Sequence, residues 1–499
     1  MTRSTTISLK CYDSPIETIS IYTKGNRMRS QLAVLAFALA ATAYAQTPAA
    51  DPATAPVAPP RAARPVMATP PIVPTVVPPA LTHPVMYNCG GAKKNAEALL
   101  PNTLVSATSA GWDLKAAPTV ANGICSTTGS SQPFFLSIPV PPGNYRITVA
   151  LGGKQASTIT VRAEARRLML EKITTAAGKT VTKTFDVNVR IPEFTKPDGT
   201  QGRVRLKARE IGNLDWDPKL TVEFNGVNPA FHTLTIEPLV GDKAEPTLYL
   251  AGDSTMVDQD VEPWASWGQQ LPRFFLPGVV VANHAESGES AISFLGEQRF
   301  AEIISIIKPG DYFFVQFAHN DQKVANGMPR YIQIMTDFVT QVRAKGATPI
   351  IVTAQNRDSF DADGHINDTL GGYPQASRKI AADTNTALID LNAMSKIMFE
   401  AMGVEGANHA FMKFKAGSYP GVAHDISDTT HFNNFGAYEL AQCIAHGIRM
   451  DNMPIAKFLD PSVRDFDPAH PDVFADFHLP YTPPQQQEDV TQIPQANLK

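Results

Sequence analysis

Short apolar runs alternate with amphipathic helical stretches between residues 246 and 450, and no other feature constrains the fold of this chain as strongly. Strands that are separated by helices cannot pair through tight hairpins, so we expect them to lie parallel in one sheet with helices on both faces. The pattern therefore predicts a mostly parallel α/β domain over 246–455. Its expected strands are 247–251, 279–283, 311–316, 348–353 and 387–390, and its expected helices include 331–345, 375–384 and 435–448.

A different pattern precedes this domain. Between 85 and 240 the chain contains short segments with period-two alternation, such as 145–149 and 158–161, and turn residues such as 141–144 separate them. No long stretch repeats with the 3.6-residue period of a helix. Alternation of this kind is typical of strands with one buried face, so we predict an antiparallel β-sandwich over 85–240.

Residues 1–45 are predicted to be an upstream extension followed by a signal peptide. Met28 is the expected start, 32–41 is apolar, and 43–45 (Ala-Tyr-Ala) has the small-x-small pattern of a cleavage site. The apolar run is too short to span a bilayer as a helix, so we expect no transmembrane anchor. A secreted or periplasmic location follows from this interpretation.

Composition describes two further segments and excludes one class of partner. The segment 46–84 is rich in proline and alanine, and it is predicted to be an extended linker. The segment 456–499 is predicted to be a C-terminal tail that is irregular at its end. The formal net charge of −4 gives no basic surface for nucleic acid.

Export implies an oxidising compartment, so cysteines beyond the cleavage site can form disulfides. Cys89 and Cys125 lie in the predicted β-sandwich and can pair. Cys443 falls in a helical pattern and is expected to be a buried, apolar-like residue. The alternative is three unpaired thiols, and the sequence holds no Cys-x-x-Cys or Cys/His zinc spacing.

Four sequence blocks hold the residues that a serine esterase requires. Ser254 follows the predicted strand 247–251 at a turn, where an open parallel sheet presents ligands and nucleophiles. A serine hydroxyl needs a base within hydrogen-bonding reach, and His431 is the candidate. Asp428 lies three residues earlier, in a turn-like stretch before the helix at 435. That spacing lets the carboxylate orient the imidazole and stabilise its protonated form.

The tetrahedral intermediate of ester hydrolysis also needs donors for its oxyanion. The backbone N–H groups of Ser254 and Gly288 and the side-chain amide of Asn320 are the candidates, since each is a neutral donor. Asp253 is equally well explained as a cap of the turn that follows it. His319, beside Asn320, is more readily a structural residue than a base.

Other chemistries fit parts of the same blocks less well. The histidines and carboxylates between 424 and 431 could bind a metal, but a metal would leave Ser254 and Asn320 without a role. The sequence 288–292 lacks the closing glycine of the α/β-hydrolase nucleophile elbow, and no Gly-rich P-loop is present. We therefore predict neither a metal nor a cofactor.

The blocks resemble those of the SGNH (GDSL) hydrolase superfamily, and in detail those of its rhamnogalacturonan acetylesterase-like group. The resemblance implies a flavodoxin-like, three-layer α/β/α fold with five parallel strands, and removal of acetyl groups from a plant cell-wall polysaccharide without a metal. The 85–240 region is similar to the galactose-binding-like β-sandwich that precedes some bacterial members. The segments that carry the main resemblance are 253–255, 283–285, 293–294, 319–321, 356–357, 363–364, 373–374, 389–391 and 428–433.

Two departures from the family pattern concern the Asn320 amide and the substrate. Ala318 stands where the family usually has a glycine before His319. Glu289 follows Gly288 where members that act on galacturonate-containing backbones commonly carry arginine. Glu289 and His319 are the predicted substrate-binding residues, and the charge of Glu289 is expected to disfavour uronates. Acetyl-xylan or another acetylated neutral sugar is therefore expected to be slightly preferred as a substrate over acetylated rhamnogalacturonan.

The sequence thus predicts an exported carbohydrate O-acetylesterase that works through an acetyl-Ser254 intermediate, with an acetylated polysaccharide or oligosaccharide as its partner. A lipase-like or thioester-cleaving GDSL enzyme is the alternative within the same class. A carbohydrate-binding protein with a catalytically inactive α/β domain is the alternative from another class.

Overall fold

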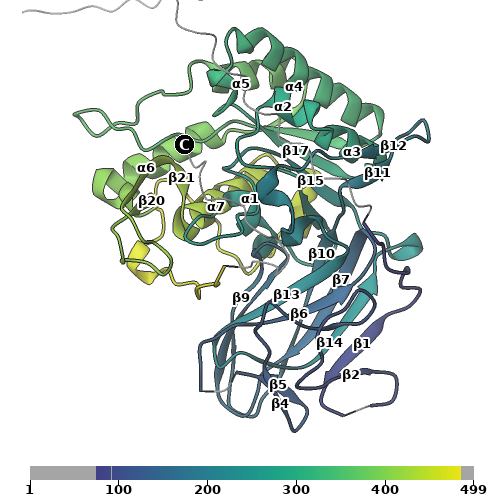
Figure 1. The fold of residues 1–499 in the computed structure, drawn as a ribbon. Helices are drawn as coiled ribbons and strands as arrows, with labels where there is room; N and C mark the ends of the chain where they lie inside the picture. The colour runs from purple at the N-terminus through teal and green to yellow at the C-terminus, as the bar shows by residue number, and fades with distance from the viewer. Residues whose placement is uncertain (1–74, 92, 128, 485–499) are drawn as a thin grey trace, which may run out of the picture. The chain divides into compact units, whose positions relative to one another are not determined.

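A parallel sheet forms the centre of the α/β region. Its strands are β15 (Thr247–Gly252), β16 (Val280–Asn283), β17 (Tyr312–Gln316), β18 (Thr348–Val352) and β19 (Ala387–Ile389). The computed structural model describes residues 75–91, 93–127 and 129–484, and within them these five strands have the spatial order β16-β15-β17-β18-β19 (Figure 1). Every neighbouring pair is parallel. The predicted parallel sheet is therefore confirmed.

Helices cover both faces of this sheet. They are α1 (Trp267–Gln270), α2 (Ala291–Gly296), α3 (Arg299–Ile306), α4 (Gly327–Ala344), α5 (Tyr373–Asp383), α6 (Leu391–Asn408) and α7 (Asn434–Met450). Leu248 and Leu250 of β15 pack in one core cluster with α6 and α7, whereas Tyr249 and Ala251 pack in another with α2 to α5. Figure 1 shows α4 and α5 on one side of β15 and β17, and α7 on the other. Burial on both faces explains why these strands appear as continuous apolar runs.

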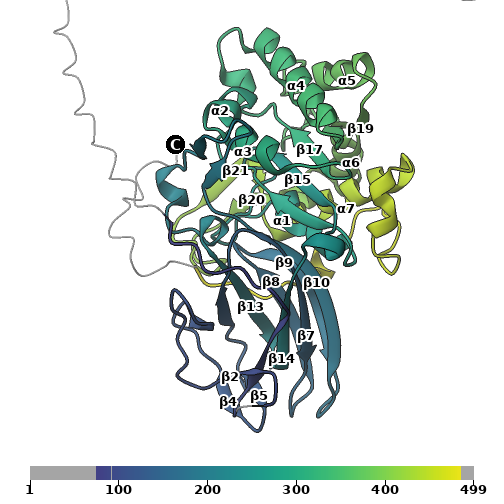
Figure 2. The ribbon, with the colours of Figure 1, turned by 90° about the vertical axis from the view of Figure 1, so that its right-hand side faces the viewer.

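Residues 85–240 form two sheets that share one hydrophobic core, and we call them the two-sheet region. The first sheet contains β1 (Val85–Cys89), β2 (Glu97–Leu99), β4 (Thr119–Ala121), β5 (Ile124–Ser126), β7 (Gly143–Leu151), β10 (Val181–Val189) and β14 (Ala230–Pro238). The second contains β3 (Gly111–Asp113), β6 (Phe134–Pro139), β8 (Ser157–Ala163), β9 (Arg167–Thr175) and β13 (Lys219–Val227). Figure 2 shows β7, β10 and β14 of the first sheet beside β8, β9 and β13 of the second. Ile147 and Ile236 of the first sheet and Val161 and Val222 of the second belong to the same core cluster.

The strand directions differ from the prediction at one place. The short edge strand β2 runs parallel to β1, with Tyr87 opposite Glu97. All other pairs in these two sheets are antiparallel. No two-residue hairpin turn joins β1 to β2, so the connection does not impose the antiparallel direction. A separate antiparallel pair, β11 (Glu193–Thr195) and β12 (Gln201–Arg203), follows β10.

The cysteines of the described residues fall into two groups. Cys89 and Cys125 form a disulfide between β1 and β5, with their Cα atoms 5.4 Å apart. Cys443 is free and fully buried in α7, as predicted. The alternative of three unpaired thiols is therefore wrong.

The stretch that carries Asp428 and His431 is a strand rather than a turn. β21 (Ile426–Phe432) pairs antiparallel with β20 (Phe411–Phe414), and α7 begins two residues after β21 ends. The run Ser-Asp-Thr-Thr-His shows no apolar alternation because most of β21 is exposed or half-buried. Pairing with β20 therefore determines its conformation, and pairing of this kind leaves no pattern in the sequence of one strand.

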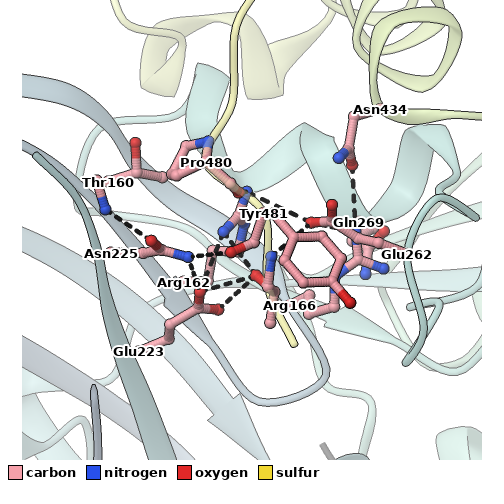
Figure 3. Close-up of polar contacts among 12 residues, drawn as sticks. Thr160, Arg162, Arg166, Glu223, Asn225, Glu262, Gln269, Asn434, Pro480 and Tyr481 are labelled. Carbon is pink, nitrogen blue, oxygen red and sulfur yellow. Dashed lines mark hydrogen bonds and ion pairs between the residues drawn. The ribbon is translucent and has the colours of Figure 1, made fainter. Parts of the chain in front are cut away.

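A buried ion pair joins the two-sheet region to the α/β region, and buried hydrogen bonds join it to the C-terminal segment (Figure 3). Arg162 of β8 contacts Glu223 of β13 at 3.2 Å and donates to the Pro480 carbonyl at 2.9 Å. Arg166, which precedes β9, pairs with Glu262 at 3.0 Å. The predicted tail is thus packed as far as the described residues extend, since Leu459, Phe466 and Thr482 are also buried. All of these residues belong to one compact unit.

Three expectations concern parts of the chain that the structure does not describe. The predicted signal peptide and most of the predicted linker lie outside the described residues, as does the end of the tail. Within 75–91, 93–127 and 129–484, no helix has both the length and the apolar character that crossing a membrane requires.

Candidate active site

Ser254 lies at the carboxyl edge of the parallel sheet, two residues after β15 ends. The Oδ1 atom of Asp253 accepts from the N–H of Thr255 at 2.9 Å and from its hydroxyl at 2.8 Å. Asp253 is fully buried, so it shapes the turn and does not face the solvent. The turn interpretation of Asp253 is therefore the one that the structure supports.

A continuous chain of hydrogen bonds joins Ser254, His431 and Asp428. The Nε2 atom of His431 lies 2.8 Å from the Oγ atom of Ser254, and its Nδ1 atom lies 2.8 Å from Oδ2 of Asp428. The N–H groups of Thr430 and His431 donate to the other oxygen of Asp428, at 2.7 and 3.0 Å. The three predicted residues are thus brought together, although 177 positions separate the serine from the histidine.

The surroundings of Asp428 keep its carboxyl group ionised. Burial disfavours the charge, but the hydrogen bond and charge of His431 and two backbone N–H groups outweigh it and lower the pKa of Asp428 to about 2. An ionised carboxylate at Nδ1 selects the tautomer that leaves Nε2 free to accept the serine proton. The arrangement can therefore increase the nucleophilicity of a serine hydroxyl.

Gly288 presents an exposed backbone N–H beside this group of residues. Its φ of +77° is a left-handed conformation that glycine adopts without steric cost. The backbone N–H groups of Ser254 and Gly288 donate to no acceptor among the described residues. Both N–H groups are therefore available to an oxyanion. A preorganised oxyanion donor must be left without a protein acceptor in this way.

Asn320 lies next to the same loop. Its Nδ2 atom donates to the Glu289 carbonyl at 2.9 Å, and its Oδ1 atom accepts from Lys323 at 2.9 Å. An amide nitrogen carries two hydrogens, so one remains for a ligand. Ala318, which replaces the usual glycine, is a buried residue of the core cluster that also contains Ala251 of β15 and Val315 of β17.

The two predicted substrate-binding side chains do not reach the solvent. Glu289 is 0% exposed, it forms an ion pair with Lys207, and it accepts from the hydroxyl of Ser293 at 2.6 Å. His319 is 2% exposed and faces Asp253 at 3.4 Å. The prediction that Glu289 repels a uronate assumed an exposed, unpaired carboxylate. That assumption is wrong, because the Glu289 carboxylate is buried and paired with Lys207.

Three residues beside the site were not assigned to it from the sequence. The Trp264 ring packs edge-on against the His431 ring, with centroids 5.4 Å apart. Arg166 donates to the carbonyls of Gln259 and Trp264, each at 2.9 Å, and Gln259 donates to the Ser254 carbonyl at 3.0 Å. Trp264 is half-buried, whereas Trp267, three residues later, is fully buried. The sequence does not assign Arg166 to the site, because no sequence pattern links it to Trp264, which lies 98 positions away.

The cluster between 424 and 431 does not gather as a metal site would. Asp425 pairs with Lys415 at 2.8 Å, whereas Asp428 is bound to His431. Within the described ranges, no group of three or more His, Cys, Asp or Glu side chains is placed to hold a metal ion. The two carboxylates thus have separate partners.

Comparisons with known proteins show what this chain is similar to. The GDSL-like Lipase/Acylhydrolase family matches residues 250–437. Rhamnogalacturonan acetylesterase RhgT of Bacillus subtilis (strain 168) is 40% identical over 216 residues, which cover 42% of this chain and 93% of that protein. The probable rhamnogalacturonan acetylesterase YesY of the same organism is 32% identical over 217 residues, covering 42% and 95%. The crystal structure of protein YxiM from Bacillus subtilis aligns over 74% of this chain and 99% of that chain, with 23% identity and a TM-score of 0.41.

The chain belongs to the GDSL-like lipase/acylhydrolase family, because the α/β region spans nearly the whole of relatives that share 40% and 32% of their residues with it. Both relatives are named as acetylesterases. The protein is therefore a carbohydrate O-acetylesterase.

Proposed function

We propose that this protein removes O-acetyl groups from a plant cell-wall polysaccharide or its oligosaccharides, with Ser254 as the nucleophile. The observation that carries the proposal is the pair of 2.8 Å contacts that connect Ser254 to His431 and His431 to Asp428. In this proposal His431 acts first as a base and then as an acid, and Asp428 orients it. The N–H groups of Ser254 and Gly288 and the amide of Asn320 bind the oxyanion.

The reaction has two balanced halves. The Oγ atom of Ser254 attacks the acetyl carbonyl while its proton passes to Nε2 of His431, and the carbonyl oxygen becomes an oxyanion. The intermediate collapses to acetyl-Ser254, and the departing sugar oxygen takes the proton from His431. Water then attacks the acetyl group, its proton passes to Nε2, and acetate leaves as Ser254 recovers its proton.

The substrate proposal changes once Glu289 is seen to be buried. The expected preference for neutral sugars depended on an unpaired carboxylate, and that carboxylate is bound by Lys207 and Ser293. The names of the relatives support acetylated rhamnogalacturonan as the first candidate. Acetyl-xylan is the second candidate.

Acetate release from acetylated rhamnogalacturonan, acetyl-xylan and p-nitrophenyl acetate tests this proposal. The wild type should release acetate, and Ser254→Ala should reduce release to the background rate because no acyl-enzyme can form. Ser305→Ala is the matched control, since Ser305 lies on α3 and its hydroxyl only donates to a carbonyl of its own helix. Mass spectrometry should find one acetyl group on the wild type and on the control but none on Ser254→Ala. Acetylation of Ser254→Ala at another serine would contradict the assignment of the nucleophile.

Export and the role of the two-sheet region also belong to this proposal. The signal pattern before residue 46 supports a secreted or periplasmic location. The two sheets with one shared core support a β-sandwich domain of the galactose-binding-like kind over 85–240, followed by the hydrolase domain over 246–455. Amino-terminal sequencing of protein purified from the culture fluid or the periplasm should find Gln46 first.

A further inference from the structure

The loop that follows β16 is held from outside the α/β region. Lys207 and Arg209 belong to a segment of the two-sheet region that lies between β12 and β13. The Nζ atom of Lys207 donates to the Ser287 carbonyl at 2.7 Å, and Nη2 of Arg209 donates to the same carbonyl. A single backbone oxygen thus accepts from two cations, and this oxygen belongs to the residue just before Gly288.

The Ser287 carbonyl and the Gly288 N–H belong to one peptide unit. A trans peptide is planar, so its C=O and N–H bonds point in opposite directions. When the two cations hold the carbonyl on one side, the N–H of Gly288 must face the other side. Hydrogen bonds from charged donors are short and strong, and they draw electron density toward the carbonyl oxygen. The N–H at the other end of the unit becomes more positive and hence a better donor to an anion.

The two cations are themselves fixed by buried carboxylates of the same loop. Lys207 pairs with Glu289, which is 0% exposed, and Arg209 donates from Nε to Glu286 at 2.7 Å. Each basic side chain therefore spans from a carboxylate to the Ser287 carbonyl. A Cβ atom placed on Gly288 would lie 3.9 Å from both cationic groups, which shows how closely they approach this peptide.

We infer that Lys207 and Arg209 are positioning residues that orient and polarise the Ser287–Gly288 peptide so that its N–H stabilises the oxyanion. This inference rests on the proposed function of Ser254 and Gly288. It gives the two-sheet region a part in turnover in addition to any part in holding carbohydrate. It also gives Glu289 a role, because this residue fixes Lys207 instead of contacting the substrate.

Kinetics of three variants test the inference. Lys207→Met/Glu289→Gln removes one cation together with the carboxylate that it would otherwise strand, and Arg209→Met removes the other cation. Each should lower kcat by about tenfold, less than the loss of a whole oxyanion donor, with KM nearly unchanged. Arg205→Met is the matched control, because Arg205 lies in the same segment but donates to the Gly296 carbonyl. Its kcat should equal that of the wild type.

Binding of benzeneboronic acid separates positioning from a merely structural role. Boron bonds to Oγ of Ser254, the serine proton passes to His431, and one B–OH oxygen of the tetrahedral adduct occupies the place of the oxyanion. Affinity for this probe should fall in proportion to kcat in the Lys207 and Arg209 variants and stay constant in Arg205→Met. Lys207→Arg, which keeps the charge, should recover most of both quantities.

Different results would overturn the inference and the proposed function. An unchanged kcat in both cation variants, a rise in KM alone, or an equal loss in Arg205→Met would each refute the role of the two cations. A wild type that neither releases acetate nor forms the boronate adduct would instead refute the proposed function of Ser254.

Discussion

The two sides of Ser254 are built in different ways. On one side, Asp428 and His431 lie three residues apart in β21, and their contacts with each other and with two backbone N–H groups arise within that strand. On the other side, Gly288 lies in a loop whose Ser287 carbonyl is held by Lys207 and Arg209 from the two-sheet region. The first side is assembled locally, and the second depends on residues about eighty positions upstream.

The comparison shows that a short sequence motif can contain the residues of a site without containing the residues that hold them in position. The proposed proton-transfer side carries its orienting carboxylate on the same strand, so the spacing Asp-x-x-His places the pair once β21 has formed by pairing with β20. On the proposed oxyanion side, this loop contributes the Gly288 N–H, and a backbone donor has no side chain that could fix its direction. A donor of that kind needs an external support, and here the support comes from another region of the chain.

The largest effect is expected on the locally assembled side. Asp428→Asn removes the carboxylate that orients His431, and kcat should fall by about 10³–10⁴-fold while KM changes little.

Because the pKa of Asp428 is held at about 2, its carboxylate adds no inflection to the pH–rate profile of the wild type above roughly pH 3. Its charge stabilises the fold above the ordinary pKa of 3.8, and this contribution is lost as the pH falls through about 2. A wild-type inflection near pH 4 that Asp428→Asn abolishes would contradict this picture.

The next effect is expected on the oxyanion side. Asn320→Ala removes one side-chain donor, and kcat should fall by about 10²–10³-fold. Steady-state kinetics with p-nitrophenyl acetate measure this, and Asn367→Ala is the matched control because Asn367 is exposed and bonds only to Ser359. Full activity in Asn320→Ala would mean that the backbone donors stabilise the oxyanion without it.

Glu289→Arg tests whether the support of the loop is electrostatic. The substitution places a second cation beside Lys207 in a buried position, so the free energy of unfolding should fall by about 3–5 kcal/mol. Denaturant unfolding of Glu289→Arg and of the wild type measures the loss. A stable variant that shifts its preference toward acetylated rhamnogalacturonan would restore the idea that Glu289 faces the substrate.

The smallest effect concerns α7, which follows β21 on the locally assembled side. Burial raises the pKa of Glu439 to about 8, from an ordinary value of 4.5. A raised carboxyl pKa stabilises the folded state below the ordinary value, and this stabilisation is lost as the pH rises through about 8. The Tm of the wild type should therefore fall more between pH 5 and pH 9 than that of Glu439→Gln. Parallel Tm curves for the two proteins would show that Glu439 does not titrate in this range.

Local patterns predicted the α/β region well because its signals are short-range. The apolar runs that became β15, β16 and β17 are buried at every residue, and β18 is buried at all but its first, so burial on both faces makes these runs continuously apolar. The edge strand β19 is buried only at Ile389. The helices α4, α5 and α7 repeat with the helical period, and their predicted ranges lie close to the observed ones. Ser254, Asp428 and His431 could be singled out for the same reason, since each lies in a compact block of polar residues.

Interpretations failed where a side chain's direction or partner was needed. Glu289 and His319 are neighbours of predicted oxyanion residues, yet both side chains point inward. The strand β21 forms through pairing with β20, so its own residues gave no sign of it. Trp264 lies against His431, and Arg166 binds the Trp264 carbonyl from 98 positions away, a relation that no sequence pattern shows.

The sequence by itself therefore determined the parallel sheet, the order of the catalytic blocks and the class of chemistry, because periodicity and residue type are local properties. The tertiary structure alone decided which way Glu289 points, which cations reach the Ser287 carbonyl, and which ring lies against His431. Those relations join residues from about eighty to about one hundred and seventy positions apart, and the free energy that fixes them comes from burial and charge pairing in the folded chain.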